Sequence, residues 1–267
     1  MDYFATELAA EKLFNLGPLD VTNSMLLGLV DSAVVVALLL VAAKRTTQRT
    51  TSTFALAFEA IIEYIVDLAD SIMHDRRKAV KFSPLFLSIF LFILTNNWIG
   101  LLPGVGPITA NGHPIFRAFT ADLNGTLALA IFTIILIQGY AIRELGMFKH
   151  LKHYFSNKPW NPINFFVGIL EILGEFTKMA SLSLRLFGNV FAGEVLLVTI
   201  AGISGYLSSV TTLPFYFLEI FVGFIQAFVF TMLTIVFLAV ATHHEHEEST
   251  AHEPAHQLET VKVTADE

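Results

Sequence analysis

Long apolar stretches recur along the chain, and they constrain its fold more than any other feature. Three of them are Ser24–Ala43, Ser83–Leu102 and Asn124–Ile142, and about 20 apolar residues of helix can cross ~30 Å of hydrocarbon. Two longer stretches follow, approximately Ile163–Ile203 and Leu213–Thr242. Only 15% of the 267 residues are charged, whereas a soluble domain has about 25%. The sequence therefore predicts an all-α, polytopic membrane protein with five crossings.

The last two apolar stretches are too long to stand upright in a bilayer. A helix of about forty residues is ~60 Å long, or twice the hydrocarbon thickness, so the fourth spanning helix must tilt, bend or begin outside the bilayer. Gly205 and its Ser and Thr neighbours separate the two stretches. We therefore expect a long, tilted helical hairpin over residues 163–242.

One further helix is predicted to lie along the membrane rather than across it. Glu59, Glu63, Asp67 and Asp70 recur at spacings of four, four and three within Phe54–His74, so they share one helical face. Apolar residues occupy most of the remaining circumference, as in an amphipathic interfacial helix. Because its polar face is acidic, a partner protein suits this face better than lipid headgroups.

The distribution of Lys and Arg predicts the orientation in the membrane. The segments after the first span, before the second and after the third hold eleven of them, whereas the opposite segments hold only Lys12 and Arg117. The positive-inside rule then places the N-terminus outside and the C-terminus inside. Residues 1–23 form an external segment, which is too acidic for a secretory signal, and residues 24–242 form a single membrane domain.

The C-terminal tail, residues 243–267, carries most of the net charge of −7, because it has seven acidic residues and one lysine. It lacks apolar periodicity, so we expect it to be disordered and its histidines to be solvated rather than bound to a metal. The chain has no basic footprint for nucleic acid. It also has no cysteine, which excludes disulfides and thiol chemistry. No cofactor or metal is expected.

Charged and amide residues interrupt the fourth apolar stretch. They are Glu171, Glu175, Lys178, Arg185, Asn189 and Glu194. Arg185 is the most constraining of them, because a guanidinium keeps its proton and costs at least ~2.5 kcal/mol at bilayer depth. Such a charge is kept where it faces a cavity, a counter-charge or an ion path.

The helical positions of these residues separate them into two groups. At about 100° per residue the first five fall within about 80° of arc, whereas Glu194 lies about 180° from Arg185 and ~13.5 Å further along. On the following helix Glu219 and Gln226 are seven residues apart, so they share a face. Antiparallel packing could bring that face near Glu194 and Asn189. Titratable groups and amides in such a place are what a proton path requires.

The residues from Ser181 to Glu194, SLSLRLFGNVFAGE, resemble the signature of subunit a of bacterial F-type ATP synthases. The resemblance extends over nearly the whole chain. It includes Asn97 with the Leu-Leu-Pro that ends at Pro103, the run from Thr120 to Asn124, and Gln226-Ala227-Phe228. The run around Arg185 is the most specific of these matches.

This resemblance implies a mechanism for ion transport. Arg185 would face a rotating ring of small proteolipid subunits (subunit c), attract a deprotonated ring carboxylate, and separate two offset half-channels. The outer path would involve Asn97, Asp122, Asn124, Glu194, Glu219, Gln226 and Asn189, and the inner path Glu171, Glu175, Lys178 and Ser181. The subunit would couple proton flow to ATP synthesis without catalysing it.

The resemblance also implies the partners and the location. The partners would be the subunit c ring, the peripheral-stalk subunit b and, through the complex, the soluble catalytic F1 head. The location would be the bacterial plasma (inner) membrane.

Several residues keep a simpler structural interpretation. Glu175 and Lys178 could form a surface ion pair, and Asp122 with Asn124 could form a helix N-cap. Some members of the resembled family carry histidine at the position of Glu219. Asp31 has no family counterpart, and we expect it to reach water near the outer end of its helix.

Two other functions remain open on the sequence alone. A proton-coupled secondary transporter could use the same carboxylates, although the chain shows no internal repeat. A non-conducting scaffold could dock a partner through the acidic face of Phe54–His74, and Arg185 would then be a structural charge.

Overall fold

The protein is a bundle of long helices in a computed structural model, which describes residues 12–16, 19–47, 53–102, 109–110, 113–114, 117–146 and 162–243. The long helices are α1 (Asn23–Thr47), α2 (Thr53–Met73), α3 (Arg76–Gly100), α4 (Leu123–Leu145), α6 (Pro162–Ser204) and α7 (Ser208–His243). The 3₁₀ helices η1 (Phe119–Ala121) and η2 (Gly205–Leu207) lie before α4 and α7. The predicted all-α, polytopic fold is confirmed.

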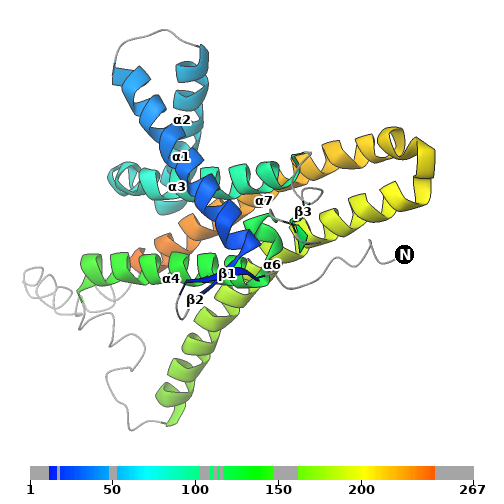
Figure 1. The fold of residues 1–267 in the computed structure, drawn as a ribbon. Coiled ribbons are helices and arrows are strands. Elements are labelled where there is room, and N and C mark those ends of the chain that lie inside the picture. Colours follow the sequence, from blue (N-terminus) through cyan, green and yellow to red (C-terminus); the bar gives the residue numbers. More distant parts are fainter. Residues whose placement is uncertain are drawn as a thin grey trace, which may run out of the picture.

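Among the described residues, four apolar helical stretches are long enough to cross a membrane. Within the described ranges the apolar stretches are Asn23–Lys44, Arg76–Gly100, Leu123–Glu144 and Phe166–Thr242, and the last contains both α6 and α7. Helix α2 is not among them. Figure 1 shows α2 running at a steep angle to α3 and α4, as expected for the amphipathic helix.

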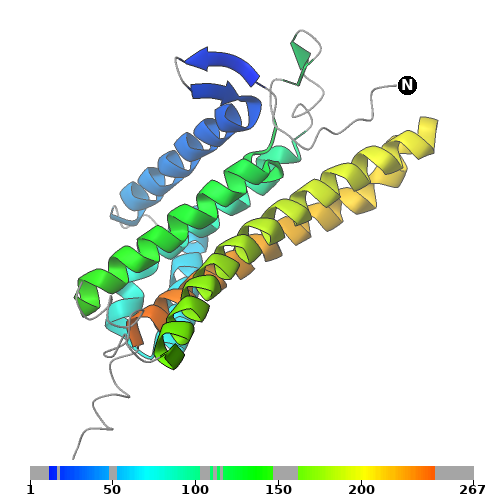
Figure 2. The same ribbon diagram turned by 90° about the horizontal axis from the view of Figure 1, so that it is seen from below.

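Helices α6 and α7 form the predicted long hairpin. They lie side by side in Figure 2 and turn back at η2. Gly205 adopts φ 53° at this turn, a left-handed conformation that glycine reaches without steric cost. The hairpin packs against α3 and α4, and its buried residues include Leu182, Leu186 and Phe230.

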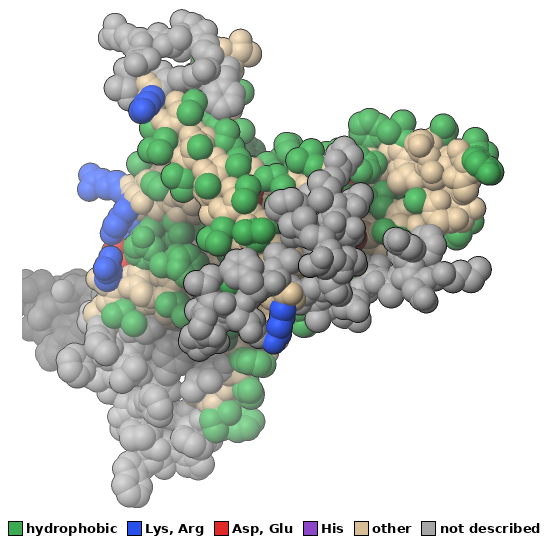
Figure 3. Space-filling model, viewed as in Figure 1, with side chains coloured by type: hydrophobic (Ala, Val, Ile, Leu, Met, Phe, Trp, Pro, Cys, Tyr) green, Lys and Arg blue, Asp and Glu red, His purple; other side chains and the backbone are tan. Residues whose placement is uncertain are grey.

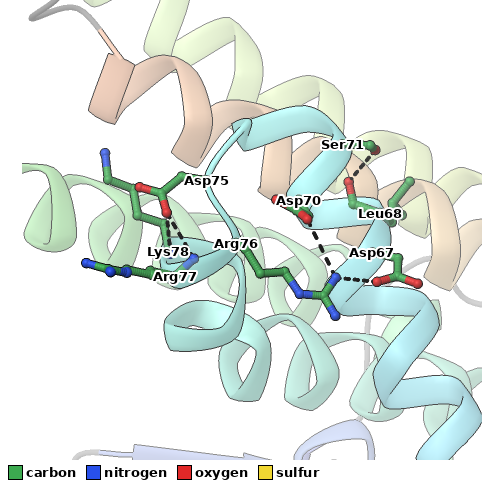
Figure 4. A network of polar contacts seen from close by, with 8 residues as sticks. All are labelled: Asp67, Leu68, Asp70, Ser71, Asp75, Arg76, Arg77 and Lys78. Atoms are coloured by element: carbon green, nitrogen blue, oxygen red, sulfur yellow. Dashed lines mark hydrogen bonds and ion pairs between the residues drawn. The ribbon is translucent and has the colours of Figure 1, made fainter.

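The α2–α3 corner shows why α3 begins before the predicted apolar span. Asp75 caps α3 by accepting hydrogen bonds from the backbone N–H groups of Arg77 and Lys78. Arg76 pairs with Asp67 and also lies 3.6 Å from Asp70, as Figure 4 shows. The helix therefore starts at Arg76 rather than at Ser83, because a side-chain cap starts a helix independently of hydrophobicity.

Two short β-hairpins accompany the helices. Strands β1 (Lys12–Leu16) and β2 (Leu19–Thr22) pair antiparallel before α1, and β3 (Thr109–Ala110) pairs with β4 (His113–Pro114) between α3 and α4. The sequence did not predict either hairpin. The tail was expected to be disordered from residue 243, but His243 is the last residue of α7. Residues 244–267 lie outside the described residues, as do residues 1–11 and 17–18 of the expected external segment.

Candidate functional site

Helices α6 and α7 face each other along a line of polar residues. Asn189 on α6 and Gln226 on α7 approach to 3.5 Å between amide nitrogen and oxygen. About one turn further along α6, the Glu219 carboxyl lies directly against Gly193, where a Cβ on the glycine would overlap it. The predicted antiparallel packing thus brings the Glu219 face against Asn189 and the residue before Glu194.

The two carboxylates of the hairpin have different surroundings. Glu194 interacts electrostatically with Arg117, which lies just before η1 and is buried. Glu219 is 8% exposed, and its carboxyl lies against Gly193 of α6. Among the described residues the two carboxyl groups do not interact with each other. Arg117, which entered the sequence argument only as a loop charge, was therefore missed.

Helix α3 closes one side of this polar line. Asn97 donates a hydrogen bond to the Gly223 carbonyl over 3.1 Å, and Trp98 Nε1 donates to the Ile220 carbonyl over 3.2 Å. Gly223 lies between Glu219 and Gln226 in the sequence. A Cβ on it would come within 3.1 Å of Asn97, so the glycine permits the close approach of α3 to α7.

Some buried atoms along this line have no hydrogen-bond partner among the described residues: Asn97 Oδ1, Glu194 Oε2 and Gln226 Nε2. Buried polar atoms are normally hydrogen-bonded to protein or to ordered water. The three helices α3, α6 and α7 thus enclose polar groups that are suited to water or to a proton in transit.

Arg185 lies outside this enclosed line. Its side chain is exposed, whereas Leu182 and Leu186 on the same helix are fully buried. In the described part of the chain Arg185 forms no hydrogen bond or ion pair. Its neighbour Leu184 is 55% exposed. A charge in a membrane span is costly unless it meets a counter-charge, a cavity or an ion path.

The inner-path candidates lie toward the start of α6. Lys178 forms an ion pair with Glu175 over 2.7 Å and lies over the Phe237 ring at 5.3 Å. The expected ion pair between Glu175 and Lys178 is thus confirmed. A role of the two residues in proton exit stays a prediction. Ser181 is exposed. The backbone of Glu171 is helical, but its side chain lies outside the described residues.

Asp122 and Asn124 form the N-terminus of α4. Asp122 accepts a hydrogen bond from the Asn124 backbone N–H over 3.1 Å, which is an N-cap. Its other carboxyl oxygen accepts from the Ser24 hydroxyl over 2.7 Å. The Asn124 side chain is exposed. A role of either residue in the outer path stays a prediction.

The expectation for Asp31 was wrong. The residue is fully buried instead of reaching water, and it accepts a hydrogen bond from Asn96 over 2.8 Å. The sequence placed Asp31 along its helix but could not show that α3 supplies an amide opposite it.

Comparison with known proteins identifies relatives over most of the chain. The family model described as ATP synthase A chain matches residues 25–239. ATP synthase subunit a 2 of Prosthecochloris aestuarii is 33% identical over 249 residues, which cover 88% of this chain and 72% of the relative. ATP synthase subunit a of Moorella thermoacetica is 32% identical over 241 residues, covering 89% and 99%. Against ATP synthase subunit a of Chlorobium phaeobacteroides, 36% identical, the match covers 74% of this chain and 58% of the relative.

Proposed function

The chain belongs to the ATP synthase A chain family, and from this premise we propose that Arg185 separates two proton half-channels and faces a ring of subunit c. The observation that carries the proposal is the contrast within α6: Arg185 is exposed on an apolar face, whereas Asn189, Gly193 and Glu194 take part in the packing against α7 and the η1 segment. A guanidinium in a membrane span is kept where it meets a counter-charge, a cavity or an ion path, and a ring carboxylate would supply the counter-charge.

The outer half-channel runs along the enclosed polar line. Glu194 and Glu219 accept and release protons there, and the amides of Asn97, Asn189 and Gln226 relay them. The buried polar atoms without protein partners support this assignment, because water or a migrating proton would satisfy them. Asp122 and Asn124 lie at the beginning of this route, at the N-terminus of α4.

The inner half-channel leads from Arg185 toward the start of α6. It passes Ser181, Lys178 and Glu175 and ends near Glu171. Separating this route from the outer one keeps the driving force, about 2.3 kcal/mol per charge per 100 mV, from being lost as a leak.

The arrangement of charges supports an orientation with the C-terminus inside. Lys81 near the start of α3 pairs with Glu144 at the end of α4, so these two helix ends lie on the same side. In Figure 3 most of the visible Lys and Arg side chains gather at this end. By the positive-inside rule this end faces the cytoplasm of a bacterial cell and the N-terminus lies outside.

Within the ATP synthase complex the subunit is stationary and non-catalytic. It contacts subunit c through the Arg185 face and the peripheral-stalk subunit b, and it reaches the F1 head through the complex. The match to an ATP synthase family does not favour a secondary transporter or a docking scaffold.

The proposal is tested by ATP-driven acidification of inverted membrane vesicles that carry Arg185→Ala. We expect pumping to be abolished while the complex stays assembled, because the exposed side chain supports no contact within the described chain. Leu184→Ala is the matched control, since Leu184 is also exposed on α6 but carries no charge. Normal pumping by assembled Arg185→Ala would refute the proposal.

A further inference from the structure

A buried polar pair joins α1 to α3 away from the proposed proton path. Asp31 and Asn96 are 0% and 1% exposed, and Asn96 Nδ2 donates to Asp31 Oδ2 over 2.8 Å. A carboxyl and an amide are costly to bury unless they are hydrogen-bonded to one another or to the backbone. The hydrogen bonds of Asn96 join it to α1 and to η1, whereas that of Asn97 joins it to α7, where the proposed path runs.

The second hydrogen bond of Asn96 fixes the direction of its side-chain amide. The backbone N–H of Phe119 donates to Asn96 Oδ1 over 3.2 Å. Because a backbone N–H can only donate, Oδ1 must face Phe119 and Nδ2 must face Asp31. Asp31 therefore serves as the acceptor that keeps Asn96 turned toward the 117–122 segment.

Three helices close tightly around this segment. The Phe119 ring packs against Gly28 of α1 and Gly125 of α4, and Ala118 packs against Gly100 of α3. A Cβ on any of these glycines would come within 2.9 Å of the segment, so the backbone has little room to shift. The Ser24–Asp122 hydrogen bond described above holds the far end of the segment to α1.

The position of this segment determines where Arg117 lies. Arg117 is its first residue, is 8% exposed, and donates to the Ala121 carbonyl over 3.3 Å. It is also the charge that acts on Glu194. Charge interactions are strong in a low-dielectric interior and fall with distance, so a small shift of the segment changes the electrostatic environment of Glu194.

The other ionisable groups on α6 and α7 do not supply the positive charge that Arg117 supplies to Glu194. Glu219 approaches from α7, against Gly193, and it is acidic. Arg185 is on α6 itself, nine residues earlier and about half a turn around the helix. From the elements packed against α6, Arg117 is the cation that interacts with Glu194 among the described residues.

We propose that Asp31 and Asn96 are a positioning pair, which acts through Phe119 to hold the 117–122 segment, and with it the Arg117 charge, in place beside α6, where Glu194 lies. This inference rests on the proposed role of Glu194 in proton translocation. Asp31 does not carry a translocated proton; it supplies the acceptor that orients Asn96.

Exchanging the two side chains tests the pair with little change in volume. Asp31→Asn keeps an acceptor for Asn96 and should conduct protons nearly as well as wild type. Asn96→Asp removes the donor and sets two carboxyl groups face to face, so conduction should fall several-fold. The exchange of both, Asp31→Asn with Asn96→Asp, restores a donor, an acceptor and the bond from Phe119, and it should recover conduction.

The measurement is passive proton conduction by membrane vesicles from which the soluble head has been removed, across a pH series and with assembly quantified. Asn96→Asp should shift the pH profile in the same direction as Arg117→Gln, and the exchange should return it to the wild-type position. Equal damage by Asp31→Asn and Asn96→Asp would instead make Asp31 a proton carrier and overturn the proposal. An exchange variant that keeps a shifted profile would also overturn it, even if Asn96→Asp fails to assemble.

The Arg185→Ala variant separates this inference from the proposed function. If Arg185→Ala blocks pumping but the exchange variant does not recover, only the positioning pair is refuted. If Arg185→Ala pumps normally, the proposed function is refuted, whatever the exchange variant shows.

Discussion

At the scale of single residues, the contact between Gly193 and Glu219 determines how closely α6 and α7 approach. The carboxyl of Glu219 occupies the space that a Cβ at position 193 would take. The spacing of residues in the sequence did not show that Gly193 and the Glu219 carboxyl meet. Glycine is required here for this close approach rather than for an unusual backbone conformation.

We therefore predict that Gly193→Ala displaces Glu219 and reduces proton pumping. The new Cβ meets only the end of the flexible Glu219 side chain, which can turn aside at little cost to stability, but the carboxyl must then leave its place beside α6. The measurement is ATP-driven acidification together with thermal unfolding of the assembled complex.

Gly139→Ala on α4 is the matched control, because a Cβ there meets nothing within 4 Å. It should leave pumping unchanged, since alanine is favoured over glycine in a helix by about 0.5–1 kcal/mol. If Gly193→Ala pumps as well as Gly139→Ala, then Glu219 does not need its place against α6.

At the scale of elements, α3 is joined to α7 by two hydrogen bonds from consecutive residues, Asn97 and Trp98. Both bonds are accepted by backbone carbonyls of α7, those of Gly223 and Ile220, which are about one helical turn apart. They fix α3 against the face of α7 that carries Glu219 and Gln226.

We predict that Trp98→Phe lowers the free energy of unfolding by about 0.5–1.5 kcal/mol, the net contribution of one hydrogen bond. Phenylalanine keeps a six-membered aromatic ring but lacks the indole N–H and its five-membered ring, so the loss reports the bond to Ile220 together with the packing of the missing ring. Thermal unfolding of the protein in detergent measures it. Phe132→Leu on α4 is the control, because Phe132 is 57% exposed on the outside of the bundle. Equal melting of Trp98→Phe and wild type would show that this bond does not secure α3.

The helices themselves could be predicted from the sequence, because their signal is local. Apolar length identified α1, α3 and α4, and the four acidic residues of one face identified α2. The long hairpin followed from two apolar stretches separated near Gly205. Helix ends were less predictable: α3 begins at Arg76 because Asp75 caps it, and this cap lies outside the apolar stretch.

At the scale of the whole molecule, sequence periodicity could not show which helices meet. The hydrogen bond from Asn96 to Asp31 joins residues 65 apart in the sequence, so Asp31 was expected to reach water. The position of Arg117, whose charge acts on Glu194, depends on the packing of α1, α3 and α4 around the η1 segment. By contrast, antiparallel packing was expected to bring the face shared by Glu219 and Gln226 near Asn189, and the hydrogen bond between Asn189 and Gln226 confirms this approach.

A disulfide between α4 and α6 would show whether these two helices must move against each other during proton pumping. Thr126 on α4 and Ser183 on α6 are both buried, and their hydroxyl oxygens are 3.1 Å apart. The chain has no cysteine, so Thr126→Cys with Ser183→Cys introduces one defined pair. The short distance between the two side chains is compatible with a disulfide, and oxidation should join α4 to α6 within one subunit.

We predict that the oxidised double variant pumps protons as well as its reduced form, because a stationary subunit does not need α4 to move relative to α6. A secondary transporter works by rocking one set of helices against another, and this crosslink would stop it. The two single-cysteine variants, treated with the same oxidant, control for the substitutions and for the reagent. Loss of pumping on oxidation, recovered by reduction and confined to the double variant, would show that α4 and α6 must move against each other. That result would contradict a rigid stator in which the moving carboxylates belong to the ring.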